Sequence, residues 1–241
     1  MDVAMFSPSS LFGHSSSDDE DGSGKKKDSY VKRKHYFPGG MELFIREFSF
    51  HFLNANLVWP GTFAFADWLA ERHSWLIGRR VLELGSGTGA LSIFLRKSFE
   101  VDITTSDFDD EDIEENIAHN CELNGVPMLP HIRHSWGDDF PNPCPNWDLV
   151  IASDILLYVK QYPNLIKTLC FLLKTYKPKG GETRTTFKLG SDVEVAPPVF
   201  LMSWRRRIGK EDEALFFSRC EESGLDVEHM GSRVYCISPK V

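Results

Sequence analysis

The sequence predicts an α/β protein built around a mostly parallel sheet. Apolar runs of strand length alternate with helical stretches through most of the chain, as a parallel sheet requires. One such run, residues 81–84, leads directly into three glycines at alternate positions, Gly85, Gly87 and Gly89. Glycine N–H groups can approach a ligand closely, and the start of the following helix carries a partial positive charge. This stretch therefore predicts a strand, a tight turn and a helix start that together bind a nucleotide-like cofactor.

The composition predicts one folded domain with a tail. The chain has 241 residues and 41% hydrophobic content, enough for one sizeable core. Residues 1–38 are rich in serine, aspartate, glycine and lysine, so we expect a disordered tail followed by a domain at residues 39–241. The charges of the tail cancel, which leaves the net charge of −8 on the domain. An acidic domain is a poor candidate for stable nucleic-acid binding.

The expected location is the cytoplasm, with the nucleus as a further possibility. The five cysteines are scattered and include no Cys-x-x-Cys pair, which favours reduced thiols over disulfides or a metal site. No apolar run approaches the roughly 20 residues needed to cross a bilayer. The basic runs at residues 25–27 and 32–34 leave a nuclear address open, although solvated charge is their commoner meaning. We expect a monomer without a bound metal.

The segment before the glycine turn contributes a helix and an aromatic residue. Residues 41–54 alternate partly between apolar and polar side chains, which predicts one or two strands beside the main sheet. Residues 62–74 read as a helix that covers one face of the sheet. Trp59 lies just before this helix. Its ring either packs against the cofactor or fixes the entry of the helix, and both interpretations stay open.

The second predicted strand, residues 101–105, leads to an acid. Asp107 follows this strand, and a carboxylate at such a position can accept two hydrogen bonds from a ribose diol. Residues 107–115 are strongly acidic, and most of these side chains are expected to stabilise the start of a helix that runs to Asn124. Only Asp107 is placed for the ligand.

The third and fourth strands carry further candidates. The third, residues 131–134, is followed by Trp136, which would either contact an adenine ring or be buried. The fourth, residues 147–154, ends in Asp154. Ligands bind at the carboxyl ends of the strands in open α/β sheets, so Asp154 is expected near Glu83 and Asp107. The alternative for Asp154 is a cap on the following turn.

The last third of the chain completes the pattern. We expect a helix at 161–174, a loose polar insertion at 175–198, a strand at 199–204, a helix at 211–223 and a closing hairpin of residues 226–229 and 234–237.

With Glu83 included, the glycine stretch Leu-Glu-Leu-Gly-Ser-Gly-Thr-Gly resembles motif I of the S-adenosylmethionine-dependent methyltransferases of the seven-strand class. Gly85, Gly87 and Ala90 also satisfy the weaker dinucleotide pattern. The closing hairpin and Glu83 favour the methyltransferases over a dehydrogenase. The resemblance implies a seven-strand Rossmann-like fold, mostly parallel with a C-terminal antiparallel hairpin, and S-adenosylmethionine as the cofactor.

Further motifs are similar to those of the lysine methyltransferase-like protein family. They are Trp59-Pro60, Ser106-Asp107, the helix with Asn116, Asn120 and Asn124, Trp136-Gly137, and the segment from Ser153-Asp154 to Leu157-Tyr158. The resemblance, with the neighbours of the motif residues, implies cofactor contacts at Trp59, Glu83, Gly85, Ser86, Gly87, Asp107, Phe108, Trp136 and Ser153. It implies a catalytic role on the substrate side for Asp154. A turn that starts at Asp154 could also bring Tyr158 back to the site as a second catalytic candidate.

The expected function is methylation of a lysine side chain on a protein substrate. One departure concerns the target, because lysine-directed members usually place an aromatic residue three positions after the aspartate, where this chain has Leu157. The tyrosine is one position later, at Tyr158. Arginine methylation, methylation of a small molecule, and a cofactor-binding interaction role without catalysis therefore stay open. The absence of an Asn-Pro-Pro-aromatic motif argues against methylation of a base or of glutamine.

Overall fold

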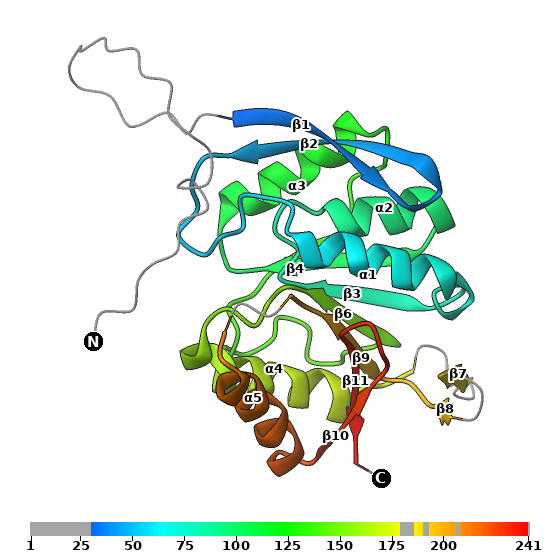
Figure 1. Cartoon of the computed structure of the whole chain (residues 1–241), viewed down its shortest axis with the longest axis vertical. Coiled ribbons are helices and arrows are strands. Elements are labelled where there is room, and N and C mark those ends of the chain that lie inside the picture. Colours follow the sequence, from blue (N-terminus) through cyan, green and yellow to red (C-terminus); the bar gives the residue numbers. More distant parts are fainter. Residues whose placement is uncertain (1–29, 179–185, 190–192, 206–207, 241) are drawn as a thin grey trace, which may run out of the picture.

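The computed structural model describes residues 30–178, 186–189, 193–205 and 208–240. Within them lies a seven-stranded sheet with the strand order β10-β11-β9-β6-β3-β4-β5 (Figure 1). Strands β9, β6, β3, β4 and β5 are parallel, and β11 is antiparallel to both of its neighbours. The seven strands are β3 (Arg80–Leu84), β4 (Asp102–Asp107), β5 (His131–Arg133), β6 (Leu149–Ser153), β9 (Val199–Ser203), β10 (Leu225–His229) and β11 (Val234–Pro239). The predicted fold class and its closing hairpin are confirmed.

Helices cover both faces of the sheet. Val81 and Ile151 belong to the core with α1, α2 and α3, whereas Leu82 and Ala152 belong to the core with α4 and α5. Neighbouring strand residues thus point to opposite apolar layers, which explains why the strands read as continuous apolar runs. The helices are α1 (Pro60–Glu71), α2 (Ala90–Phe99), α3 (Glu111–Leu123), α4 (Tyr162–Lys174), α5 (Lys210–Glu222) and the short 3-10 turns Pro38–Gly40, His73–Trp75 and Val159–Gln161. None of the helices in the described ranges is long and apolar enough to cross a bilayer.

A hairpin of β1 (Tyr30–Phe37) and β2 (Met41–Phe48) lies outside the main sheet, beside α3 (Figure 1). The predicted boundary of the disordered tail at residue 38 is therefore wrong, because residues 30–37 form a paired strand. Its side chains are mostly exposed, so the apolar alternation of a half-buried strand is missing. Main-chain pairing with β2 and contacts to a buried acid hold it instead. Residues 1–29 lie outside the described part of the chain.

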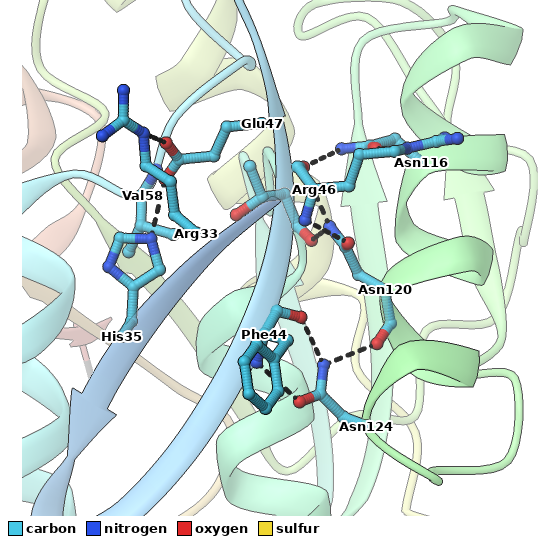
Figure 2. A network of polar contacts seen from close by, with 10 residues as sticks. Arg33, His35, Phe44, Arg46, Glu47, Val58, Asn116, Asn120 and Asn124 are labelled. Atoms are coloured by element: carbon cyan, nitrogen blue, oxygen red, sulfur yellow. Dashed lines mark hydrogen bonds and ion pairs between the residues drawn. The ribbon is translucent and has the colours of Figure 1, made fainter. Parts of the chain in front are cut away.

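The buried acid is Glu47, whose side chain joins three segments (Figure 2). Glu47 Oε2 pairs with Arg33 Nε at 2.9 Å, and Glu47 Oε1 lies 2.8 Å from His35 Nε2. The backbone N–H of Val58 donates to the same Oε1 at 3.2 Å. Glu47 therefore connects both strands of the hairpin to the segment that enters Trp59.

The other edge of β2 pairs with asparagine side chains of α3 rather than with a strand (Figure 2). Asn124 accepts from Phe44 N at 2.9 Å and donates to Phe44 O at 2.8 Å. Asn120 accepts from Arg46 N at 2.7 Å, and its amide N–H₂ bonds Thr88 O at 2.9 Å. Four helical residues rise about 6 Å and two strand residues about 6.6 Å, so the two spacings match. The hairpin is thus fixed to α3 and, through Thr88, to the glycine turn.

The insertion at residues 175–198 is less loose than predicted. It contains a short antiparallel pair, β7 (Phe187–Leu189) and β8 (Val193–Val195). Each of these strands has only three residues, too short for their apolar-polar alternation to predict a strand. The segments 179–185 and 190–192 lie outside the described residues.

Candidate active site

The carboxyl ends of β3, β4, β5 and β6 open onto a cavity of about 440 Å³. The loop between β2 and α1 forms a further part of its wall through Leu53, Asn54 and Ala55. Most of the predicted site residues line it, namely Trp59, Gly85, Gly87, Asp107, Phe108, Trp136, Ser153, Asp154 and Tyr158. The residues that the sequence singled out at separate strand ends thus meet at one cavity.

The turn after β3 needs its glycines for backbone geometry. Gly85, Gly87 and Gly89 have φ values of 65°, 51° and 75°, a region that side chains with a Cβ rarely adopt. A Cβ on Gly85 would also lie 2.7 Å from Ile155 Cγ2. The turn is therefore fixed both by its own conformation and by the segment that follows β6.

The Ser86 side chain makes hydrogen bonds within the protein. Its Oγ lies 3.1 Å from Glu83 O and 3.2 Å from Ser106 O, and it accepts a 3.0 Å bond from Ser106 N. The hydroxyl group thus joins the ends of β3 and β4. Ser86 borders only a small second cavity of about 30 Å³, which shares Gly85 and Gly87 with the larger one.

Asp107 holds the turn and faces the cavity. Its Oδ2 accepts a 2.6 Å bond from Gly87 N, and its Oδ1 accepts a 2.8 Å bond from Phe108 N. Burial raises the pKa of Asp107, and these two backbone bonds oppose the rise. An ionised carboxyl group has about four lone-pair positions, so acceptor positions are left for a ligand.

Glu83 lies in the small second cavity, together with Trp59 and Ser153. Its side chain is buried and accepts a short hydrogen bond from Ser92 Oγ. Burial raises the pKa of Glu83 to about 8; the bond from Ser92 opposes this rise, and the charge of Asp107 adds to it. Ser92 was not predicted, because a serine inside a helix gives no local sign of its partner.

The Asp154 side chain, directly after β6, caps the start of α1. Its Oδ2 accepts a 2.6 Å bond from Gly61 N at the start of α1, and its Oδ1 accepts a 2.7 Å bond from Arg205 N after β9. The residue is buried and has a φ of 54°, unusual for a side chain with a Cβ. The sequence offered a catalytic acid or a cap on the following turn. The structure shows a cap, but on α1.

Tyr158 lines the cavity, and 41% of the residue is exposed. The Asn54 side chain donates a 2.5 Å hydrogen bond to the Tyr158 hydroxyl oxygen, and Trp59 Nε1 donates to Asn54 O at 2.9 Å. Burial raises the pKa of Tyr158, and the bond from Asn54 opposes the rise. Asn54 was missed by sequence reasoning, because no pattern marks an isolated loop asparagine.

The cavity wall is acidic. It contains the carboxyl groups of Asp107, Asp138 and Asp154, and its described lining includes no lysine or arginine. Among the described residues, no group of three His, Cys, Asp or Glu side chains is arranged to hold a metal ion. The wall is suited to a cationic organic ligand.

Solved structures with the same fold include two proteins of Thermus thermophilus. The 16S rRNA N2 G1207 methyltransferase RsmC, in complex with AdoMet and guanosine, has a TM-score of 0.57 at 17% identity over 88% of this chain and 51% of that chain. TrmN has a TM-score of 0.51 at 15% identity over 90% of this chain and 61% of that chain. At this identity the likeness shows the fold.

Sequence relatives lie among protein methyltransferases. The chain is 28% identical to protein N-terminal and lysine N-methyltransferase efm7 of Aspergillus fumigatus, over 60% of this chain and 61% of that protein. It is 30% identical to EEF1A lysine methyltransferase 3 of Xenopus tropicalis over 60% of this chain and 65% of the relative. It is 26% identical to histone-arginine methyltransferase METTL23 of Xenopus laevis over 56% of this chain and 57% of the relative.

The chain thus spans about three fifths of the length of these relatives. The model of the lysine methyltransferase family matches residues 41–179, which is more than half of the 241 residues. This match includes the hairpin strand β2, the glycine turn, all four strand ends at the cavity and Tyr158. The chain belongs to the lysine methyltransferase family.

Proposed function

We propose that this protein transfers a methyl group from S-adenosylmethionine to a lysine side chain of another protein. The observation that carries the proposal is the cavity at the strand ends, with Asp107, Asp138 and Asp154 in its wall and no lysine or arginine in its described lining. Acidic clefts with apolar walls concentrate cations, and both the sulfonium cofactor and a lysine amine are cationic. The family and the names of the relatives support the same reaction.

The residues at the cavity fit this cofactor. A volume of about 440 Å³ lies within the range of roughly 300–1,000 Å³ found for small-molecule sites. Asp107 has acceptor positions left for a ribose diol, and Phe108 and Trp136 offer aromatic walls for the adenine. Glu83, beside the glycine turn, offers an acceptor for the amino-acid end.

The bound cofactor would supply an electrophilic methyl group on sulfur, whose bonding electron pair stays on sulfur when the methyl group moves to nitrogen. The protein must place the target nitrogen and keep it unprotonated. A free lysine has a pKa of about 10.4, so the site has to favour loss of that proton before transfer. We assign the placement of the nitrogen to the mouth of the cavity, where the proton passes to water before transfer. Tyr158 accepts a hydrogen bond from the nitrogen, and the negative charge of Asp154 stabilises the positive charge that develops there.

Orienting the nitrogen contributes most of the rate in this account. A bimolecular reaction becomes effectively unimolecular when both reactants are held in line. Asp154 serves this purpose even as a cap, because it fixes the start of α1 and with it Trp59 at the cavity wall. Its structural role and its charge therefore act at the same place.

Arginine methylation is the second candidate. Leu157 lines the cavity at the position where the resemblance expects an aromatic ring in lysine-directed members. A leucine there widens the mouth and removes a ring that would select a narrow aliphatic side chain. One of the similar proteins carries a histone-arginine methyltransferase name.

The test is to incubate the purified protein with methyl-labelled S-adenosylmethionine and cell lysate. The wild-type protein should label discrete protein bands, and Asp107→Ala should label none because it has lost the ribose acceptor. Calorimetry with S-adenosylhomocysteine and NAD gives the control for binding. Binding of NAD but not of S-adenosylhomocysteine would contradict the proposal, as would label that enters no protein.

A further inference from the structure

Asn54 holds a central place in the loop that forms one wall of the cavity. Its φ is 60°, a left-handed conformation that asparagine tolerates better than most residues with a Cβ. The Asn54 N–H donates to His51 O at 2.9 Å, and His51 Nδ1 accepts from Leu53 N at 3.2 Å and Ala55 N at 3.4 Å. The loop is therefore wrapped around one histidine ring.

The same ring anchors the loop to the main fold. His51 Nε2 lies 3.3 Å from Asp110 Oδ2, and Asp110 Oδ1 caps the start of α3 by accepting from Asp112 N at 2.9 Å. The His51 side chain is buried and that of Asp110 is partly exposed, so the histidine end of the anchor is shielded from water. The backbone position of Asn54 is consequently set by contacts that do not involve its own side chain.

The side chain of Asn54 is left to act on Tyr158. Its Nδ2 donates a 2.5 Å bond to the Tyr158 hydroxyl oxygen, across a separation of 104 residues. The carbonyl group of Asn54 accepts a 2.9 Å hydrogen bond from Trp59 Nε1. Asn54, Trp59 and Tyr158 all line the cavity. One loop residue thus connects the cofactor candidate Trp59, through its backbone, with the substrate-side candidate Tyr158, through its side chain.

Tyr158 needs such a partner to keep one position. The residue is 41% exposed, and an exposed side chain samples several rotamers unless a contact selects one. The bond from Asn54 occupies one acceptor position of the phenol oxygen and so directs the remaining position and the hydroxyl proton. A group that is already ordered when the substrate arrives loses less entropy on binding.

We propose that Asn54 is a positioning residue that fixes the Tyr158 hydroxyl group at the mouth of the cavity, where it meets the nitrogen to be methylated. This rests on the methyltransferase function proposed above. Asn54 itself touches neither the nitrogen nor the methyl group in this account. Its effect on turnover passes through Tyr158 and therefore cannot exceed the effect of removing the Tyr158 hydroxyl.

Two substitutions isolate the side chain. Asn54→Gly keeps the left-handed backbone and the carbonyl bond to Trp59 but removes the amide group. Asn54→Ala removes the same amide group, while the contacts around His51 hold the backbone of the loop. Both should lower kcat about 10-fold, the value of one hydrogen bond that orders a reacting group, and leave the affinity for S-adenosylhomocysteine within about 2-fold. Asn142→Gly, at a turn outside the cavity lining, is the matched control and should behave as wild type.

A double-mutant cycle shows whether Asn54 acts through Tyr158. The double variant Asn54→Gly, Tyr158→Phe should be as slow as Tyr158→Phe alone. Additive losses would overturn the proposal, as would wild-type kcat in both Asn54 variants.

A readout without turnover separates this inference from the proposed function. In protein with ¹³C-labelled tyrosine rings, the Tyr158 signal, assigned by its loss in Tyr158→Phe, should titrate at higher pH in Asn54→Gly, because a donor that stabilises the phenolate is gone. An unchanged titration would refute the positioning role. If the wild-type protein methylates nothing, the proposed function fails, and this titration still decides whether Asn54 fixes Tyr158.

Discussion

Asp154 Oδ2 accepts a 2.6 Å hydrogen bond from the backbone N–H of Gly61, which joins the carboxyl end of β6 to the start of α1. The two residues are 93 positions apart in the chain. α1 follows directly after Trp59, so this bond also fixes a wall residue of the cavity. A carboxylate that was expected to serve chemistry is therefore part of the framework that shapes the site.

Asp154→Asn should lower both stability and turnover. Its amide group can accept from only one of the two backbone donors, and its N–H₂ then faces the other. An unsatisfied buried donor costs about 1–3 kcal/mol, and the loss of one preorganised charge slows turnover by about 10² or more. Urea denaturation and initial rates at a temperature where the variant is folded separate the two effects. Unchanged turnover in the folded variant would leave Asp154 with the cap alone.

Asn120→Ala should destabilise the fold more than removal of an exposed asparagine. The substitution leaves Arg46 N and Thr88 O without their buried partner, at about 1–3 kcal/mol for each group. A loss of about 2–6 kcal/mol in the free energy of unfolding is expected from denaturant titration. Asn164→Ala, which removes an exposed side chain bonded to Gln161, is the control. Equal stability of the two variants would mean that the asparagine pairing of β2 contributes little.

Two truncations locate the end of the tail. Removal of residues 1–29 should leave the melting temperature within about 2 °C of the full chain, because a polar segment of this composition buries little apolar surface. Removal of residues 1–36 also deletes nearly all of β1, including Arg33 and His35, the side-chain partners of Glu47. Loss of these contacts and of the main-chain pairing of β1 should lower the melting temperature by more than about 4 °C. A differential scan that finds both truncations equally stable would place β1 outside the cooperative fold.

Glu83 should make the protein less stable as the pH rises from about 4.5 to about 8. Burial raises the pKa of Glu83 from 4.5 to about 8, so in this window the folded state keeps a proton that the unfolded state has released. The free energy of unfolding then falls with pH, by up to about 1.4 kcal/mol per unit. Glu83→Gln should flatten this part of the curve, whereas Glu115→Gln, at an exposed position of α3, should not. Parallel curves for wild type and Glu83→Gln, measured by urea denaturation at several pH values, would count against the buried position of Glu83.

The sequence was sufficient to predict those candidate site residues that come directly after a strand. Each predicted strand leads to a candidate: the first to the alternate glycines, the second to Asp107 and the fourth to Asp154. The carboxyl ends of parallel strands meet at one edge of the sheet. Their convergence on one cavity could therefore be predicted. The hairpin could not be predicted in full, since β1 has mostly exposed side chains and is held by Glu47 and by main-chain pairing.

Contacts between distant loops escaped prediction for a physical reason. Asn54 and Tyr158 are brought together only when two connections after different strands meet at the cavity. In the same way, Asp154 meets Gly61 only when the start of α1 packs beside the carboxyl end of β6. No local propensity encodes such a pair, because each residue would be acceptable in its own loop without the other.

The chemical identity of the methylated residue decides whether this protein methylates lysine side chains of other proteins. Lysate proteins labelled by the purified enzyme with methyl-labelled S-adenosylmethionine are hydrolysed completely, and the labelled amino acid is identified by chromatography and mass spectrometry. The account predicts methyllysine, formed by the wild-type protein and reduced by about 10² or more in the folded Asp154→Asn variant. Methylarginine would move the assignment to the second candidate, and label confined to small molecules or nucleic acid would contradict the account.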